Sequence, residues 1–377
     1  MDRARAGDWQ VTHERYLATT PFGALDGLRA IAILAVVWHH TGPGIDALPM
    51  TGRGFLGVDL FFTISGFLIV TLLLRERRRT AAISLRRFYA RRALRIFPPY
   101  YAMLAFVGGV AALSHRGAPN PIGDDLPFAA VYVSNLVPMG SLLSITWSLS
   151  AEEQFYCIVP ALEKYARRAW LLLLPLLYVV ASLPPFGLFA ALPLPDFFRQ
   201  TTFGPILLGV ALAHVLDTRV GYARVARLLG NRFAAPTALM LVLVAANHPT
   251  PDIAGWPRLA IQWSLLALVA SCVVQEVHVL TPALRIAPLR RIGLVSYGIY
   301  LYHLIVVHVV DRLLTGAGLS WHATRFVGTM VATWLVAELS FRLFESRVLA
   351  YRRRFDAPMN VQPVAAEQVI VVAQRQQ

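Results

Sequence analysis

Residues 55–74 read FLGVDLFFTISGFLIVTLLL, and Asp59 is the only charged side chain within them. A helix of this length is about 30 Å long, which is the thickness of a bilayer's hydrocarbon core. Similar apolar runs recur along the chain, so that 56% of all residues are hydrophobic and only 15% are charged. A soluble domain usually carries about a quarter charged residues. The sequence therefore predicts a polytopic, all-α bundle of transmembrane helices.

About ten spans are expected when a window of bilayer length is moved along the chain. Pro and Gly interrupt several of them, which helix bundles in lipid tolerate. The seventh span is short for a crossing. The expected spans are residues 28–44, 55–74, 96–113, 147–163, 169–186, 200–216, 234–247, 258–275, 296–314 and 323–344.

The basic residues predict the orientation of this bundle, because cytoplasmic loops of membrane proteins carry an excess of Lys and Arg. With the N-terminus in the cytoplasm, most of the 35 Lys and Arg residues fall on inside segments. Both termini are therefore expected to be cytoplasmic. The net charge of +14 would suggest nucleic acid in a soluble chain, but here this topology explains it. The basic residues left outside are Arg53, Arg116, Arg199, Arg258, Arg312 and Arg325.

The expected organisation is one membrane domain between two cytoplasmic ends. Residues 1–24 form a polar segment with no cleavable signal peptide, residues 25–347 form the transmembrane domain, and residues 348–377 form a disordered tail. The two cysteines, Cys157 and Cys272, lie inside apolar runs and indicate neither a disulfide framework nor a metal site.

Charged side chains inside a span are costly unless they are paired or hydrated, so each is a candidate for function. Arg29 and His40 in the first span are eleven residues apart, which at about 100° per residue is close to three full turns. Both side chains therefore face the same way, about 16 Å apart along the helix axis. His39 points about 100° away from them. The alternative is that Arg29 and His40 only anchor the two membrane interfaces.

Three acidic residues lie where their spans enter the membrane from outside, at a depth similar to that of His40. The carboxylate of Asp59 could orient an imidazole or raise its basicity, and the alternative is an acid that caps the helix at the membrane surface. Glu152 and Glu153 are adjacent near the start of the fourth span. A capping acid at a helix start explains one of them but hardly both. All three acids are candidate catalytic residues.

A basic stretch precedes the third span and reads FYARRALRIFPPY over residues 88–100. Arg91, Arg92 and Arg95 fall on adjacent faces of a predicted helix. Guanidinium groups suit phosphates, and coenzyme A carries a pyrophosphate and a 3′-phosphate. One interpretation is a cytoplasmic site for acyl-coenzyme A, and the other is attraction to anionic lipid headgroups.

The ninth span contains the string SYGIYLYHL at residues 296–304. This string places His303 near the middle of the membrane with tyrosines around it. An imidazole in this position could bind a substrate or relay a proton.

Taken together, five groups of residues resemble the membrane-bound acyltransferase-3 family. They follow in order from residue 25 to about residue 347, so the resemblance covers essentially the whole bundle. The groups are LDGLR at 25–29 with His40; GVDLFF and ISGFLI at 57–69; FYARR at 88–92 with Arg95; TWSLS at 146–150 with Glu152 and Glu153; and SYGIYLYH at 296–303.

The resemblance implies an integral-membrane O-acyltransferase of the bacterial inner membrane, without the soluble esterase-like extension that some members carry. It implies transfer of an acyl group, commonly acetyl, from cytoplasmic acyl-coenzyme A to a hydroxyl. The acceptor would be a cell-surface or lipid-linked saccharide, or a small molecule such as a macrolide. No permanently bound cofactor and no nucleic-acid partner are expected. The essential arginine and histidine of the family map onto Arg29 and His40.

On this interpretation Arg91, Arg92 and Arg95 bind the coenzyme A phosphates, and Arg29 guides the donor into the bundle. The competing hypothesis is a transporter or flippase of a lipid-linked glycan, whose intramembrane charges serve as gates.

The expected chemistry centres on His40, either as general base on the acceptor hydroxyl or as a residue that is acylated first. The developing oxyanion needs a hydrogen-bond donor, and Ser65 or Tyr302 are the candidates. His303 completes the expected substrate-binding residues.

Overall fold

A computed structural model of the protein describes residues 12–19, 22–45, 47–114, 120–183, 203–249, 253–319 and 322–345. These ranges are predominantly helical, and their only β pairing is an isolated bridge between Ile45 and Leu48. The all-α prediction is therefore confirmed. The main helices are α2 (Gly23–Thr41), α3 (Leu56–Thr80), α4 (Leu85–Ser114), α5 (Pro121–Ala130), α6 (Thr146–Tyr165), α7 (Arg167–Ser182), α9 (Gly204–Asp217), α10 (Arg219–Leu229), α11 (Ala234–Ala246), α12 (Gly255–Val274), α13 (Thr281–Leu284), α14 (Ala287–Leu294), α15 (Ser296–Gly316) and α16 (His322–Ser340).

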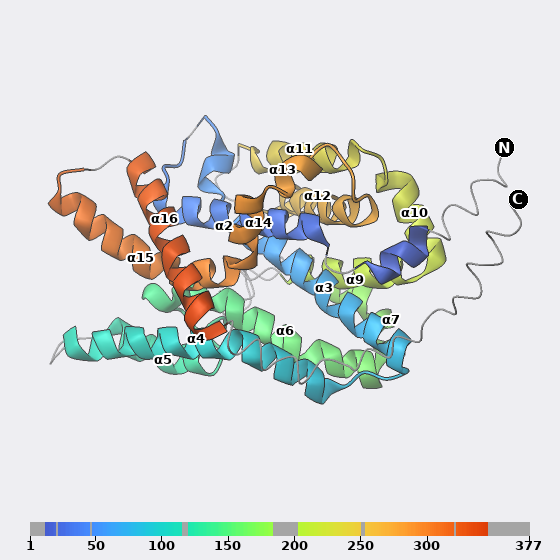
Figure 1. Cartoon of the computed structure of the whole chain (residues 1–377), viewed down its shortest axis with the longest axis horizontal. Coiled ribbons are helices and arrows are strands. Elements are labelled where there is room, and N and C mark those ends of the chain that lie inside the picture. The colour runs from blue at the N-terminus through green and yellow to red at the C-terminus, as the bar shows by residue number, and fades with distance from the viewer. Residues whose placement is uncertain are drawn as a thin grey trace, which may run out of the picture.

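The helices form a bundle in which α2 and α3 lie in the middle (Figure 1). Helices α4, α5 and α6 lie along one side, and α11 and α12 lie on the opposite side. Helices α15 and α16 pack against each other and against α2. The segments that carry most of the predicted site residues therefore meet around α2 and α3, although they are far apart in sequence.

Helices α3 and α9 approach each other at two glycines. A Cβ atom on Gly66 would lie 2.1 Å from the carbonyl oxygen of Ile206, and one on Gly209 would lie 2.2 Å from that of Thr63. Neither position has room for a side chain. Small residues let helix backbones pack closely in a membrane, where packing itself holds helices together. This contact fixes the central helix α3 against its neighbour.

Five helices of the described chain are long and apolar enough to cross a membrane: α3, α4, α12, α15 and α16, the last counted to Leu343. Two bent pairs raise this number to seven, namely the segment Thr12–Ala18 with α2, at 63°, and α9 with α10, at 111°. The expected ten spans are not confirmed, because α7 has 16 residues, α11 has 13, and α6 carries several charged residues. The orientation of the termini stays a prediction.

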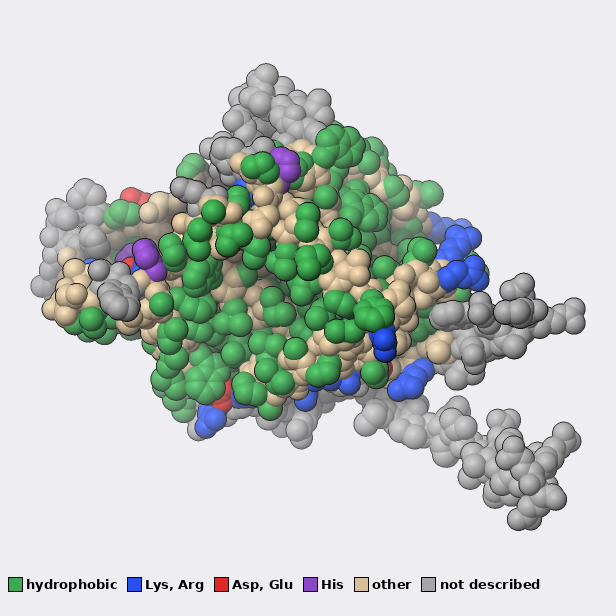
Figure 2. Space-filling model, turned by 90° about the horizontal axis from the view of Figure 1, so that it is seen from above, with side chains coloured by type: hydrophobic (Ala, Val, Ile, Leu, Met, Phe, Trp, Pro, Cys, Tyr) green, Lys and Arg blue, Asp and Glu red, His purple; other side chains and the backbone are tan. Residues whose placement is uncertain are grey.

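The face drawn in Figure 2 is largely covered by hydrophobic side chains, and Lys and Arg side chains lie mainly towards its edges. Large hydrophobic residues are exposed on several helices, for example Leu172, Met240 and Leu335. An apolar surface of this kind promotes aggregation in water, whereas contact with lipid tails requires it. The surface and the apolar helices together support a multi-pass membrane protein.

The structure corrects the boundaries of the third predicted span. The expected spans 55–74 and 96–113 leave residues 75–95 between them, but α3 continues to Thr80 and α4 begins at Leu85. A left-handed residue, Ala81 with φ 57°, ends α3, so only a short turn separates the two helices. Arginine is a good helix former, and its charge does not end a helix. The predicted boundary at residue 24 falls in the first turn of α2, and the boundary at residue 347 and the tail 348–377 lie outside the described residues.

Candidate active site

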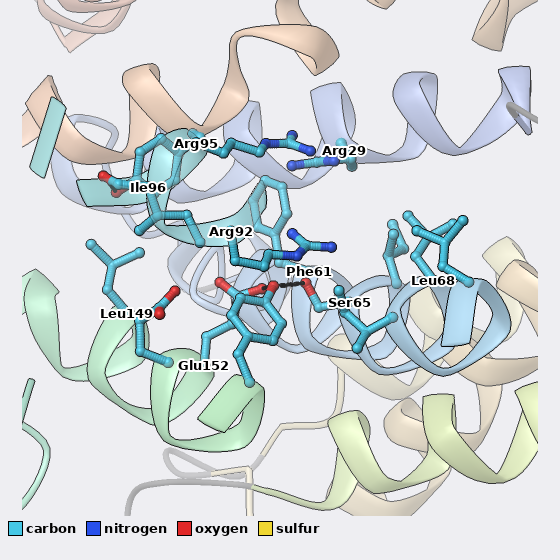
Figure 3. Close-up of a pocket in the computed structure, with 15 residues that line it drawn as sticks. Arg29, Phe61, Ser65, Leu68, Arg92, Arg95, Ile96, Leu149 and Glu152 are labelled. Atoms are coloured by element: carbon cyan, nitrogen blue, oxygen red, sulfur yellow. Dashed lines mark hydrogen bonds between the residues drawn. The ribbon is translucent and has the colours of Figure 1, made fainter. Parts of the chain in front are cut away.

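A cavity of about 120 Å³ lies where α2, α3, α4, α6 and α15 meet (Figure 3). We call it the arginine cavity. Part of its lining is apolar and includes Phe61 and Leu149. Side chains predicted to be functional supply most of its charge. Those that line it are Arg29, Ser65, Arg92, Arg95, Glu152 and Glu153.

Three guanidinium groups converge on the arginine cavity. Figure 3 shows the head groups of Arg29 and Arg95 next to each other, with that of Arg92 below them. Arg92 stacks on the ring of Tyr156, 4.8 Å from its centroid. Within the described part of the chain, none of the three guanidiniums forms an ion pair, and the buried Nε of Arg29 has no hydrogen-bond partner. Half-buried cations without an ion-pair partner in the described part of the chain make the cavity a candidate site for an anion.

Glu152 is held in this cavity by two hydroxyl groups. Ser65 Oγ and the Tyr156 hydroxyl both donate hydrogen bonds to it, and these two hydroxyls lie 3.2 Å apart. Glu152 also acts electrostatically on Arg29. The sequence placed Glu152 at the depth of His40, but the structure places it beside Arg29. The reason is its position six residues into α6, about 9 Å from the start of the helix.

Glu153 points into the same cavity from the next position of α6. Its side chain is buried, and the charges that act on it are those of Glu152 and Arg92. Two acids and three guanidiniums therefore share one cavity, which leaves an excess of positive charge when all five groups are ionised.

A smaller cavity of about 50 Å³ continues from the first one. The two share Arg29, Ser65 and Glu152 among their lining residues. The smaller cavity is also lined by Tyr300, whose hydroxyl is hydrogen-bonded to Ser148 Oγ at 2.6 Å. The Tyr300 hydroxyl is thus fixed at the wall of this cavity.

His40 and His303 form a pair beyond Tyr300. Their ring centroids are 4.9 Å apart at an interplanar angle of 62°, and the ring of His303 lies 5.5 Å from that of Tyr300. Each Nδ1 donates a hydrogen bond to a backbone oxygen, that of Val36 for His40 (2.9 Å) and that of Tyr300 for His303 (2.6 Å). Donation from Nδ1 leaves each Nε2 with a lone pair. His303 Nε2 is buried and has no hydrogen-bond partner in the described part of the chain.

Asp59 is ion-paired with Arg258 of α12. The guanidinium Nη2 lies 2.9 Å from Oδ1 and 2.7 Å from Oδ2 of the carboxylate, and both side chains are buried. The sequence suggested that Asp59 orients an imidazole, and the partner that the structure gives it is an arginine. Sequence reasoning assigned Arg258 only to the outer loops.

Two further candidates do not line either cavity. Arg91 is ion-paired with Glu76 at 3.5 Å, because it lies about 100° around α4 from Arg92. Arg92 and Arg95, three residues apart, share one helix face and both reach the arginine cavity. The Tyr302 hydroxyl is hydrogen-bonded to Ser340 Oγ on α16, at 3.0 Å.

Sequence reasoning missed four hydroxyl-bearing residues of the smaller cavity, namely Ser148, Ser296, Tyr297 and Tyr300. Helical spacing could have indicated two of them. Ser296, Tyr300 and His303 follow an i, i+4, i+7 pattern, which places them on one face of α15.

Comparison with known proteins identifies relatives of this chain. Residues 22–339 match a family model described as an acyltransferase domain. The chain is 28% identical to the peptidoglycan O-acetyltransferase OatA of Listeria monocytogenes, over 86% of this chain and 55% of that protein. It is also 28% identical to YrhL of Bacillus subtilis, provisionally named a peptidoglycan O-acetyltransferase, over 89% of this chain and 55% of that protein.

A provisionally named O-acetyltransferase of Staphylococcus aureus is 38% identical over 153 residues, which are 37% of this chain and 24% of that protein. The chain spans about half the length of OatA and YrhL. No solved structure matches it.

Proposed function

The chain belongs to the acyltransferase family, as the resemblance predicted, and we propose on this premise that it is a membrane O-acyltransferase. The donor is an acyl-coenzyme A, with acetyl as the expected acyl group. The acceptor is a hydroxyl of a cell-envelope saccharide. The observation that carries the proposal is the convergence of three guanidiniums, none of them ion-paired within the described chain, on one cavity inside an apolar bundle.

The donor's phosphates bind at Arg29, Arg92 and Arg95. Guanidinium groups bind phosphate oxygens through charge-assisted hydrogen bonds, which are among the strongest in proteins. Arg92 and Arg95 lie on the part of α4 that the distribution of basic residues assigns to the cytoplasmic side. Acyl-coenzyme A would reach them from the cytoplasm. Of the three predicted phosphate ligands on α4, the proposal therefore retains Arg92 and Arg95. Arg91 contributes less to phosphate binding.

His40 is the proposed general base. Its Nδ1 is engaged by the Val36 carbonyl, so its Nε2 is the atom that accepts a proton. The acceptor oxygen attacks the thioester carbon, a C–O bond forms, and the C–S bond breaks. The hydroxyl proton passes through His40 Nε2 to the sulfur, which leaves as the thiol of coenzyme A. Arg29 and His40 are about 16 Å apart along α2, a distance comparable to the reach of the pantetheine arm.

The nature of the relatives supports an envelope saccharide as acceptor. OatA is named a peptidoglycan O-acetyltransferase, and a chain embedded in the inner membrane would meet such saccharides or their lipid-linked precursors. A small-molecule acceptor such as a macrolide is the other possibility for the same chemistry. The transporter hypothesis is not favoured, because these relatives are named for acetyl transfer.

The test uses the purified full chain in lipid nanodiscs with acetyl-coenzyme A labelled in its acetyl group. We expect release of free coenzyme A that depends on added envelope saccharide, and label recovered as a base-labile ester on that saccharide. His308→Ala is the matched control for His40→Ala, because His308 is exposed and, among the described residues, its side chain is hydrogen-bonded to Leu304 of its own helix. Movement of a lipid-linked glycan across the membrane without any release of coenzyme A would contradict the proposal.

A further inference from the structure

The smaller cavity leads from the arginine cavity towards the histidine pair. It shares Arg29, Ser65 and Glu152 with the arginine cavity, and Tyr300 lines it. The ring of Tyr300 is in turn 5.5 Å from the ring of His303. A group that passes from the larger cavity into the smaller one therefore stops one side chain short of the histidine pair.

One buried hydroxyl of this cavity lacks a partner. Ser296 is 0% exposed, and its Oγ makes no hydrogen bond with any described residue. The neighbouring hydroxyls of Ser148 and Tyr300 are hydrogen-bonded to each other at 2.6 Å, so each of them has a partner. Leaving a buried hydroxyl unsatisfied costs free energy, and such a group indicates a ligand that brings an acceptor atom. A thioester carbonyl oxygen is a neutral acceptor of this kind.

Part of the wall is apolar. Val58, Phe62 and Leu149 line the cavity and are all buried, and Phe62 is backed edge-on by Trp147. A water molecule needs roughly 10–15 Å³ of such space. The volume of about 50 Å³ therefore holds roughly three to five groups of that size. An acetyl group has three non-hydrogen atoms and fits easily, whereas a butyryl group has five and is at the upper limit.

We propose that the smaller cavity binds the acyl group of the donor thioester and selects it by length. Ser296 Oγ donates a hydrogen bond to the carbonyl oxygen, and Val58, Phe62 and Leu149 disfavour chains longer than three carbons. This inference rests on the proposed function, since it takes acyl-coenzyme A as donor. It adds to that function the residues that choose the acyl group. No bond is made or broken in this binding step.

The experiment compares acetyl-, propionyl- and butyryl-coenzyme A as donors for the wild-type chain, Val58→Ala and Leu149→Ala. The quantity measured is the ratio of kcat/KM for butyryl to that for acetyl donor, which does not depend on how much of a variant folds. We expect the ratio to rise roughly tenfold or more in both variants, because one methylene is worth about 10–200-fold in selectivity. Val70→Ala is the matched control, since Val70 is a buried residue of α3 that lines neither cavity.

A second variant tests the hydrogen bond. Ser296→Ala should lower kcat for acetyl transfer roughly a hundredfold, while the Kd for free coenzyme A stays unchanged. Ser271→Ala is its control, because the Ser271 hydroxyl bonds the carbonyl of Ala267 in its own helix. A wild-type chain that uses butyryl as well as acetyl donor, unchanged ratios in both wall variants, or full activity of Ser296→Ala would overturn the assignment. Failure of every acyl-coenzyme A to yield product would overturn the proposed function itself.

Discussion

Glu152 lies among the cations of the arginine cavity and is fixed there by Ser65 and Tyr156. A carboxylate that accepts two hydroxyl hydrogen bonds in a low-dielectric site is firmly positioned. Its charge offsets part of the positive charge that Arg29 and Arg92 bring. We expect this arrangement to moderate the attraction of the cavity for an anion, so that the proposed donor could also leave.

We therefore predict that Glu152→Gln binds coenzyme A at least as tightly as the wild-type chain. The amide keeps an oxygen for the two hydroxyl groups and removes a charge that repels phosphate. The Kd from a calorimetric titration measures the effect, with Glu276→Gln, outside both cavities, as control. A Kd severalfold weaker in a folded Glu152→Gln chain would show that this carboxylate supports donor binding instead of opposing it.

His40→Ala should reduce acyl transfer by roughly 10²–10⁴-fold, the usual contribution of a general base. The Kd for coenzyme A should not change, because the proposed phosphate ligand Arg29 lies about 16 Å away along α2 and His40 lines neither cavity. Comparing rate and affinity for this variant and for His308→Ala separates loss of the base from loss of the fold. Full activity of His40→Ala would remove His40 from the mechanism, and His39 would be the next residue to test.

At the scale of helices, the ion pair of Asp59 and Arg258 connects α3 with α12. The two residues are 199 positions apart in sequence, and their side chains are 4% and 7% exposed. Breaking a buried pair leaves one uncompensated charge, which costs about 3–5 kcal/mol. Replacing both charges by apolar groups of similar volume costs much less. The pair thus couples two helices that no local pattern relates.

We predict that each single variant, Asp59→Leu or Arg258→Met, clearly lowers the midpoint temperature of thermal unfolding in detergent. The double variant should regain most of that loss, because no charge is then left alone in the interior. Acyl transfer should return together with stability if Asp59 has a structural role. A stable double variant without activity would instead support Asp59 as the residue that orients an imidazole.

Local patterns in the sequence predicted helices and singled out several residues that line the arginine cavity. Apolar runs of membrane length indicated the helices, and Arg91, Arg92 and Arg95 were placed on adjacent faces of one helix, of which Arg92 and Arg95 line the cavity. The pairing of Asp59 with Arg258 could not be predicted, because it depends on how α3 and α12 pack in the whole bundle. The position of Glu152 beside Arg29 could not be predicted for a related reason. A helix start read from composition alone is uncertain by several residues, and one turn changes the depth by about 5 Å.

At the scale of the whole molecule, the two-sided mechanism depends on a topology that rests on the basic residues alone. We expect Arg86→Cys to react with an impermeant maleimide only after cells are permeabilised, because the start of α4 is predicted to face the cytoplasm. Thr315 is exposed near the C-terminal end of α15, which the predicted topology places outside the cell. Thr315→Cys should therefore react in intact cells. Both variants need the background Cys157→Ala, Cys272→Ala, which removes the two native thiols. Labelling of Arg86→Cys in intact cells would invert the topology and place the arginine cavity's entrance outside.

The central claim is that the arginine cavity binds the phosphates of an acyl-coenzyme A. The most direct test is a calorimetric titration of coenzyme A into the full chain in nanodiscs, for the wild type and for variants of α4. Arg92→Ala and Arg95→Ala should each weaken the Kd roughly 10- to 100-fold, which corresponds to about 1.5–3 kcal/mol for one charge-assisted hydrogen bond. Arg91→Ala should weaken coenzyme A binding less, because Arg91 is ion-paired with Glu76. The exposed control Arg86→Ala should leave the Kd unchanged. An unchanged Kd in both Arg92→Ala and Arg95→Ala, or no binding to the wild-type chain, would contradict the account.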